Sequence, residues 1–345
     1  VTATQQWERF FNRQSLKQQL VSRYIYEHLF IGHLHFQGHP DHEFYRLTRS
    51  TTPTGEPINE IATRHPYDDP GVRHFYYRLR PVEASIVEKT HFVYELSVDK
   101  MQRYHELFFQ SDYRVTQLPS YQPEVAANPF VAFVDIPPRS RYQFMLDDAQ
   151  FFVSGFIKGP VCRGQLALNV IRDRFWVVFF HPGAEKVHSD MVKDMGGFLA
   201  KQIPTLSLPG TAGDELGLFG YKEYDDLANL YLKNKEAFVD QLLEKYGTLN
   251  LGDIWDGGGV NTNAALTVFR HSESATVVQG LIGEPPLTGW VVDYPLFERI
   301  HYLLVAGFDV YSSLNHQLAS RSYMDFLRVD GENNFLRFMP ANQRS

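Results

Sequence analysis

The chain contains a single cysteine, Cys162, whose neighbours are suited to chemistry. A nucleophilic thiolate needs a lowered pKa, which nearby cations or a helix N-terminus provide. Lys158 and Arg163 are such cations, but the cysteine follows the expected C-terminus of a helix, whose dipole disfavours a thiolate. No signature of a cysteine hydrolase surrounds it. We therefore interpret Cys162 as a packed residue and keep a catalytic role for it as the alternative.

Three polar side chains near this cysteine suit the head group of an amphiphile. Lys158, Arg163 and Gln165 lie between an expected helix end and an expected strand. Cations and amides hold a carboxylate or a phosphate, while neighbouring Phe side chains enclose an alkyl chain. The sequence therefore predicts a head-group cluster at these three residues.

Five histidines crowd one short segment: His28, His33, His35, His39 and His42. Imidazole is a common ligand of haem iron and of transition metals. If the segment is helical, His28 and His35 share one face and His33 does not. The zinc motif HExxH is absent, so hydrogen-bonded histidines are the alternative to ligands.

A loop rich in charge, "IATRHPYDDPGVRHFYYRLRP", begins at Ile61. Its charged side chains are Arg64, Asp68, Asp69, Arg73, Arg78 and Arg80. Such residues hold an anion or form an internal network of ion pairs. We favour the network, because paired Arg and Asp side chains commonly fix irregular loops.

The elements that position these residues are expected to be helices and strands. Apolar spacing and a capping box at Ser15–Gln18 predict one long helix that ends near residue 36. Other helices are predicted at 98–110, 139–157, 189–201, 221–246 and within 294–339. Strands are predicted at 43–48, 74–80 and within 85–96, and hairpins at 164–171 with 175–181 and at 264–271 with 275–282.

This order of elements predicts an α+β fold in which antiparallel hairpins pack with long helices. The two hairpins do not align well, so we expect no internal repeat. We expect a single region over residues 1–345, with a sub-boundary near 115–130, where Pro119, Pro123 and Pro129 mark a loop.

Composition excludes several classes of function. The net charge of −7 and the absence of a basic stripe argue against a nucleic-acid partner. The longest apolar run, residues 175–180, is far shorter than a bilayer span of roughly 20 residues. One cysteine excludes an internal disulfide and the CxxCH motif of c-type haem attachment. Gly257–Gly259 lacks the spacing of a phosphate-binding loop and is interpreted as a turn.

Long stretches resemble the bacterial fatty acid cis-trans isomerases. The residues that carry the resemblance are "RYIYEHLFIGHLHF", "EFYRLTRSTTPTGEPINEIATRHPYDDPGVRHFYYRLRP", "NPFVAFVDIPPRSRYQFMLDDAQFFVSGFIKGPVCRGQLALNVI" and "FWVVFFHP". The stretch "GFIKGPVCRGQ" is the most specific of them. The resemblance implies conversion of cis double bonds to trans in membrane fatty acids, in the periplasm, with a c-type haem.

The family's signal peptide and CxxCH motif lie upstream of the stretches that match. We therefore expect this chain to be an internal part of a longer protein, with haem c attached outside it. The resemblance implies His28, then His33 and His35, as residues near haem, and Cys162 as a thiol that lines the pocket. Expected partners are unsaturated fatty acids or phospholipids, the membrane surface and the haem-bearing segment. The alternatives are a non-catalytic lipid-binding module and a cysteine-dependent enzyme.

Overall fold

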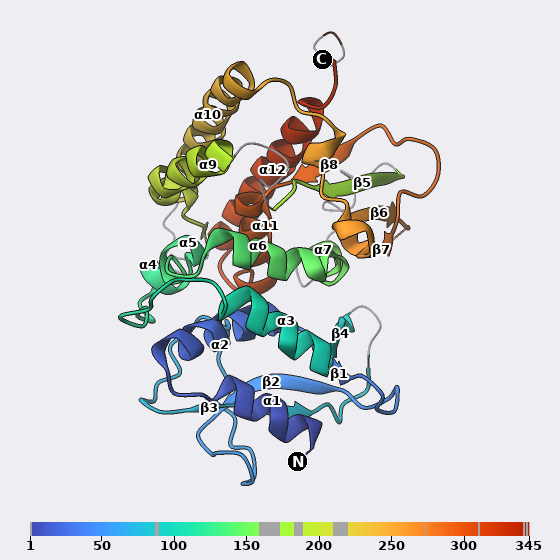
Figure 1. Ribbon diagram of the computed structural model, residues 1–345. Coiled ribbons are helices and arrows are strands. Elements are labelled where there is room, and N and C mark those ends of the chain that lie inside the picture. Colours follow the sequence, from blue (N-terminus) through green and yellow to red (C-terminus); the bar gives the residue numbers. More distant parts are fainter. Residues whose placement is uncertain are drawn as a thin grey trace. The chain divides into compact units, whose positions relative to one another are not determined.

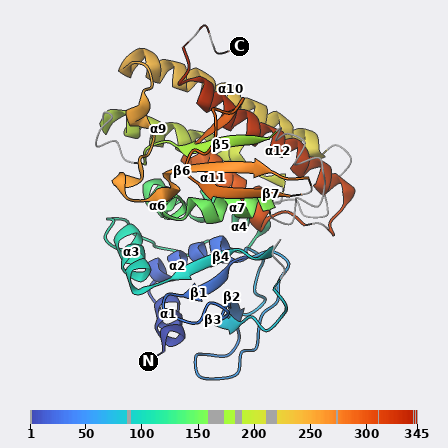
Figure 2. The ribbon, with the colours of Figure 1, turned by 90° about the vertical axis from the view of Figure 1, so that its right-hand side faces the viewer.

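The computed structural model describes residues 2–86, 90–158, 173–182, 189–209, 220–272, 274–309, 311–340, 342 and 344. Helices and strands are mixed along the chain, as expected of an α+β fold. The chain divides into two compact units, residues 1–140 (unit 1) and residues 141–345 (unit 2). Figures 1 and 2 show unit 1 in blue to green and unit 2 in green to red.

Unit 1 is built on a four-stranded sheet. Its helices are α1 (Ala3–Phe11), α2 (Leu16–Leu29), α3 (Val98–Phe108), α4 (Pro123–Ala126) and α5 (Pro129–Ala132), and α6 (Pro138–Asp147) runs into unit 2. Its strands are β1 (His33–Phe36), β2 (Tyr45–Ser50), β3 (Tyr76–Pro81) and β4 (Val93–Leu96). The strand order is β3-β2-β1-β4, antiparallel except for the parallel pair β1 and β4.

Aromatic side chains form the core of unit 1. Trp7, Phe10 and Phe11 of α1 are buried, and the Trp7 ring meets the Tyr104 ring of α3 edge to face at 5.7 Å. Such pairs add about 0.5–1.5 kcal/mol to the free energy gained by burial. The high aromatic content is therefore in part a property of this core.

Unit 2 adds long helices to a second four-stranded sheet. Its helices are α7 (Ala149–Lys158), α9 (Ser189–Gln202), α10 (Gly220–Tyr246), α11 (Tyr294–Ile300) and α12 (Leu314–Leu336), with a π-helix at His301–Ala306 and 3-10 turns at Ile203–Leu206, Leu251–Asp253, Gly257–Gly259 and Thr262–Ala264. Its strands are β5 (Arg174–Phe179), β6 (Ala265–Arg270), β7 (Ala275–Gln279) and β8 (Gly289–Val292). The strand order is β7-β6-β5-β8.

Helices α7 and α12 pack against β7 and β8 respectively (Figure 1). The close approach of α12 depends on Gly331, because a Cβ added there would lie 3.1 Å from the Trp290 ring of β8. Phe175 and Trp290 meet within the sheet at 4.8 Å between ring centroids.

The two sheets share one topology. In each, the first strand pairs antiparallel with the second and parallel with the fourth, and the third strand lies outside the second. The fourth strand is followed in each unit by one capping residue and a helix, with Ser97 before α3 and Asp293 before α11. A repeat of strand order therefore exists between the units, although the sequence did not lead us to expect an internal repeat.

Several predicted elements need correction. The helix expected to reach residue 36 ends at Leu29, and His33–Phe36 form a strand. Gly32, a poor helix former, lies at this junction, and its N–H donates to the Leu29 carbonyl. The helix expected over 139–157 is two helices, because Asp148 separates α6 from α7. Both sheets are mixed rather than purely antiparallel, since each contains one parallel pair.

Several other predicted elements agree with the structure. The hairpin of β6 and β7 is confirmed, as are the long helices α9, α10 and α12. The run 164–171 lies outside the described residues, and β5 pairs with β6 on one side and β8 on the other.

Candidate functional site

The predicted head-group cluster is described only at its first residue. Lys158 is the last residue of α7 and is half-buried. Cys162, Arg163 and Gln165 lie outside the described residues. Their grouping as a head-group site, and the role of the thiol, stay predictions.

His28 lies in the interior of unit 1. It is fully buried on α2, and its ring lies 4.0 Å from the Tyr24 ring between centroids. Its Nδ1 is 2.7 Å from the Tyr24 carbonyl oxygen. Because a carbonyl only accepts, Nδ1 carries the proton in this contact, which fixes the orientation of the ring.

His33 and His35 lie two residues apart on β1 and therefore on one face of the sheet. The Nδ1 atoms of His33 and His91 are 2.6 Å apart, and His35 Nδ1 lies 3.2 Å from the Glu43 carbonyl oxygen. Burial, together with the charge of Arg46, lowers the pKa of His33 to about 4. The His33 ring is therefore neutral at pH 7.

A second cluster in unit 1 combines buried charge with tyrosines; we call it the Arg49 cluster. It consists of Arg23, Tyr26, Glu27, Arg49, Tyr77 and Tyr121. In its first half, Arg23 Nε donates to Glu27 Oε1 at 2.8 Å, one turn further along α2. Arg23 Nη1 donates to the Pro119 carbonyl, and the Tyr121 ring lies 3.9 Å from the guanidinium.

In the second half of the cluster, Arg49 of β2 is 1% exposed. Its Nη1 donates to the Asp68 carbonyl at 2.8 Å and its Nη2 to Thr63 Oγ1 at 2.6 Å. Both acceptors are neutral. No ion pair joins Arg49 to a carboxylate in the described part of the chain.

The three tyrosines of the Arg49 cluster are protonated at neutral pH. Burial raises the pKa of Tyr26 to about 12 and also raises the pKa values of Tyr77 and Tyr121. Arg49 opposes this shift at all three, and Arg23 opposes it at Tyr77 and Tyr121. Both guanidinium groups therefore act on the same two hydroxyls.

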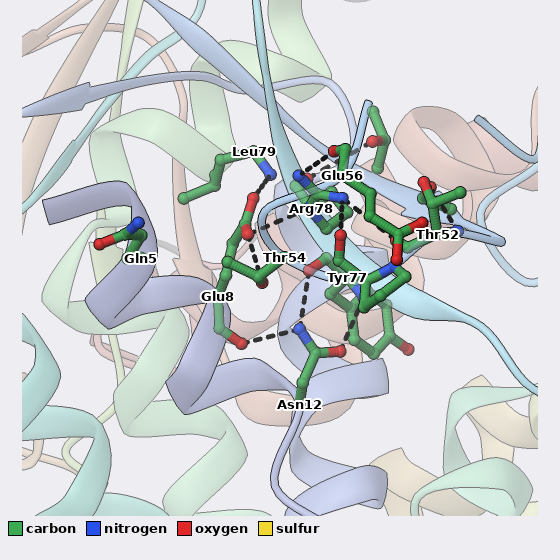
Figure 3. A network of polar contacts seen from close by, with 12 residues as sticks. Gln5, Glu8, Asn12, Thr52, Thr54, Glu56, Tyr77, Arg78 and Leu79 are labelled. Carbon is green, nitrogen blue, oxygen red and sulfur yellow. Dashed lines mark hydrogen bonds and ion pairs between the residues drawn. The ribbon is translucent and has the colours of Figure 1, made fainter. Parts of the chain in front are cut away.

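The Tyr77 backbone is fixed by a network that Figure 3 shows. Asn12, the residue that follows α1, accepts from the Tyr77 N–H at 2.9 Å and donates to the Tyr77 carbonyl at 2.8 Å. The buried Glu8 carboxylate accepts from Arg78 Nε at 3.0 Å and from the Leu79 N–H at 2.9 Å. This network joins α1 to β3 and holds the strand that carries Tyr77.

His65 and Asp68 organise the loop against Arg49. Asp68 accepts from the His65 N–H at 2.7 Å, and its Oδ1 lies 3.2 Å from His65 Nδ1. Burial opposes the charged form of Asp68, but these hydrogen bonds and the charge of Arg49 hold its pKa below the ordinary value. The buried Nε2 of His65 has no hydrogen-bond partner among the described residues, and its ring stacks on Tyr67.

Two of the other charges in this stretch, Arg78 and Arg80, form ion pairs within unit 1, as the favoured interpretation predicted. Arg78 pairs with Glu8, and Arg80 Nε pairs with Glu60 at 2.9 Å. Asp69 accepts from the Gly71 N–H at 2.8 Å.

The family model for fatty acid cis/trans isomerases matches residues 1–345, which is the whole chain. The chain belongs to this family. A comparison with curated proteins finds no match, and a comparison with solved structures finds none either. Membership supports an isomerase that acts on fatty acids, and the resemblance inferred from the sequence is confirmed.

Unit 2 of this isomerase-family chain also contains buried charge, in a group we call the four-ion cluster: Lys235, Asp293, Arg299 and Asp330. Lys235 Nζ contacts Asp293 and lies 2.5 Å from Asp330 Oδ1. Arg299 Nη2 lies 2.5 Å from Asp330 Oδ2. Burial opposes both charges, yet the carboxylates raise the pKa of Lys235 and Lys235 lowers that of Asp293.

The sequence predictions did not include Arg23 or Arg49. Two features of the sequence could have indicated them. Arg23 and Glu27 are four residues apart in an apolar helical stretch, and Arg49 shares a strand face with Leu47, which is buried. Charged side chains are rarely buried without a partner, so an arginine on a buried face of a helix or strand indicates a polar site.

Within the described ranges of the chain, no group of three or more His, Cys, Asp or Glu side chains is placed to hold a metal ion. No helix in the same ranges is both long enough and apolar enough to cross a bilayer.

Proposed function

We propose that the chain forms the substrate-holding part of a haem-dependent fatty acid cis/trans isomerase. The family match over all 345 residues carries the proposal. Its substrates are unsaturated acyl chains, as free fatty acids or in phospholipids, and its product is the trans isomer. We further propose that it works in the periplasm at the membrane surface.

Haem c belongs, in this proposal, to a segment outside the chain. Several imidazoles of unit 1 fit a role as iron ligand, because their orientation or their neutral form is already set. His28 is held in one orientation by the contact of its Nδ1 with the Tyr24 carbonyl. His65 is fixed through Nδ1, and its buried Nε2 has no hydrogen-bond partner among the described residues, which favours coordination through Nε2. His33 is neutral at pH 7, as a ligand must be. His28 remains the first choice, followed by His33 and His35; the geometry adds His65.

The chemistry that haem supplies when bound is reversible withdrawal of electron density from the double bond, which allows rotation about it. The chain's own residues hold the acyl chain in place, keep water away and bind the polar end of the substrate. Apolar side chains exposed in the loop between β7 and β8 suit contact with lipid: Leu281, Ile282 and Leu287.

The test is gas chromatography of fatty acid isomers after incubation with cis-palmitoleate. Three samples are compared: the full-length parent protein, this chain alone, and this chain with the separately made haem segment. We expect trans product from the parent and from the combined sample, and none from the chain alone. Trans product from the chain alone would contradict haem dependence and favour Cys162; an inactive parent would contradict the isomerase function.

A further inference from the structure

The Arg49 cluster contains a buried cation that no carboxylate contacts. Charged side chains are almost never fully buried unless they are paired, because loss of hydration disfavours the ion. Arg49 is 1% exposed, and its hydrogen-bond acceptors, the Asp68 carbonyl and the hydroxyls of Thr63, Tyr26 and Tyr121, carry no charge. The carboxylate of Asp68 is directed at His65 instead. Arg49 therefore lacks the direct anionic contact that its burial calls for.

Two guanidinium nitrogens of the cluster have no acceptor. Arg49 Nε and Arg23 Nη2 are buried and make no hydrogen bond to any described residue. Arg23 and Tyr26 lie three residues apart on α2, and the Arg49 guanidinium lies 5.3 Å from the centre of the Tyr26 ring. The Tyr26 ring lies 5.2 Å from the Tyr77 ring, and Arg23 lies 3.9 Å from the Tyr121 ring, so both guanidinium groups border the same tyrosines. A buried, charged donor that has no acceptor lowers the stability of the fold. An oxyanion that accepts from Arg49 Nε and Arg23 Nη2 would therefore stabilise this arrangement.

The surroundings favour an oxyanion over a neutral ligand. The tyrosines are protonated, so each can donate an O–H to a negative oxygen and none adds a competing charge. Glu27, the carboxylate of the cluster, is already engaged by Arg23 Nε. Arg78 and Arg299, two other buried arginines, already contact carboxylates.

An irregular segment borders the Arg49 cluster. Tyr121 and Pro119 come from the segment between α3 and α4, residues 109–122, which contains neither helix nor strand. This segment supplies both the ring over Arg23 and the carbonyl that Arg23 Nη1 contacts. Irregular segments open locally more readily than sheets or helices do.

We propose that Arg49 and Arg23, with the hydroxyls of Tyr77 and Tyr121, bind the oxyanion at the polar end of an acyl substrate. The ligand is a carboxylate if the substrate is a free fatty acid and a phosphate if it is a phospholipid. This inference rests on the proposed function for the identity of the substrate. It assigns the head group to residues of unit 1, in place of the cluster that the sequence predicts at Lys158, Arg163 and Gln165.

The test compares ligands that differ only in charge. Binding of palmitoleate and of its uncharged methyl ester to this chain is measured by calorimetry at constant ionic strength, for the unaltered chain and for Arg49→Gln. We expect Arg49→Gln to weaken palmitoleate binding about tenfold or more, the usual effect of losing a charge-assisted hydrogen bond, and to leave methyl ester binding unchanged. Equal weakening of both ligands, or of neither, would overturn the inference.

Arg80→Gln is the matched control, because Arg80 lies on the neighbouring strand β3 but is half-exposed and paired with Glu60. It should leave the binding of both ligands unchanged, and a selective loss of palmitoleate binding in this variant would overturn the assignment to Arg49. If Arg49→Gln does not fold, the melting temperature of the unaltered chain is measured instead, with palmitoleate and with its methyl ester. Palmitoleate must then raise the melting temperature, and an equal rise with the methyl ester would overturn the proposal.

A third ligand separates the two sources of the oxyanion. Dipalmitoleoyl phosphatidylglycerol carries a phosphate and no free carboxylate, so dependence of its binding on Arg49 indicates phospholipid, and dependence of palmitoleate binding alone indicates free acid. The isomer assay of the full-length parent is run in parallel. Selective binding with no isomerisation would leave the site standing and refute the function, whereas isomerisation without charge-selective binding would refute the site alone.

Discussion

The Arg49 cluster of unit 1 and the four-ion cluster of unit 2 are both buried, but they differ in how many of their cations contact a carboxylate. In the four-ion cluster each cation contacts a carboxylate, and Asp330 contacts both Lys235 and Arg299. In the Arg49 cluster only Arg23 has such a contact, and two guanidinium nitrogens have no acceptor. A complete set of partners is typical of a structural ion cluster, while a missing partner points to a ligand.

The largest effect is expected when the complete cluster is broken. Asp330→Asn leaves Lys235 and Arg299 with less negative charge in a buried setting and should lower the free energy of unfolding by about 3–5 kcal/mol. Urea denaturation of the chain measures this loss. Asp240→Asn, at an exposed pair with Arg337, is the control and should cost less than about 1 kcal/mol. Similar losses in both variants would remove the distinction between the clusters.

Arg49→Met tests the incomplete cluster in the same assay. The variant loses hydrogen bonds to neutral acceptors, but it also removes a buried cation that has no ion pair, so we expect a loss of about 1–2 kcal/mol. Arg78→Met is the comparison, because Arg78 is buried one strand away and pairs with the buried Glu8. Arg49→Met should be the milder change. A loss at Arg49 as large as that at Arg78 would mean that Arg49 is a structural residue.

Ser97 and Asp293 occupy equivalent positions, because each follows the fourth strand of its sheet and caps the next helix. Ser97 accepts from the Lys100 N–H, and Asp293 accepts from the Leu296 N–H. Ser97→Ala should cost about 1 kcal/mol in urea denaturation, the usual value for a cap. Asp293→Ala should cost more, because Asp293 also contacts Lys235. Equal losses would show that the ion contact contributes nothing beyond capping.

As pH falls, unit 1 should lose stability at a higher pH than the four-ion cluster does. The pKa of His33 is lowered to about 4 in the folded chain, so between pH 6.5 and 4 the unfolded chain binds the extra proton and stability falls as pH falls. We expect this loss to be below about 1 kcal/mol, because His91, which contacts the buried His33, is partly exposed and water screens the pair. The pKa of Asp293 is lowered, so its contribution is lost only below about pH 4.

Melting temperatures recorded across this range check the order of the two effects. His33→Asn should flatten the dependence between pH 6.5 and 4 and leave the decline at lower pH unchanged. An unchanged slope in that variant would assign the titration to another group.

Local patterns were sufficient to predict the long helices and the hairpin of β6 and β7. The helix expected to reach residue 36 was wrong because α2 is buried on nearly every side, so its apolar residues show no boundary at Leu29. The Arg49 cluster could not be predicted as a unit. Its contacts join Arg49 to Thr63 and Asp68, and Arg23 to Pro119, and such distant pairings depend on the fold rather than on spacing. The family, by contrast, was evident from the quoted stretches alone.

The shared strand order of the two sheets shows where unit 2 carries additional structure. Helices α9 and α10 lie between β5 and β6, whereas the segment between β1 and β2 contains no helix. Because α10 carries Lys235, a cation that contacts the capping residue Asp293 comes from this additional segment. The connection between the first two strands is therefore the position at which this topology accommodates a long insert.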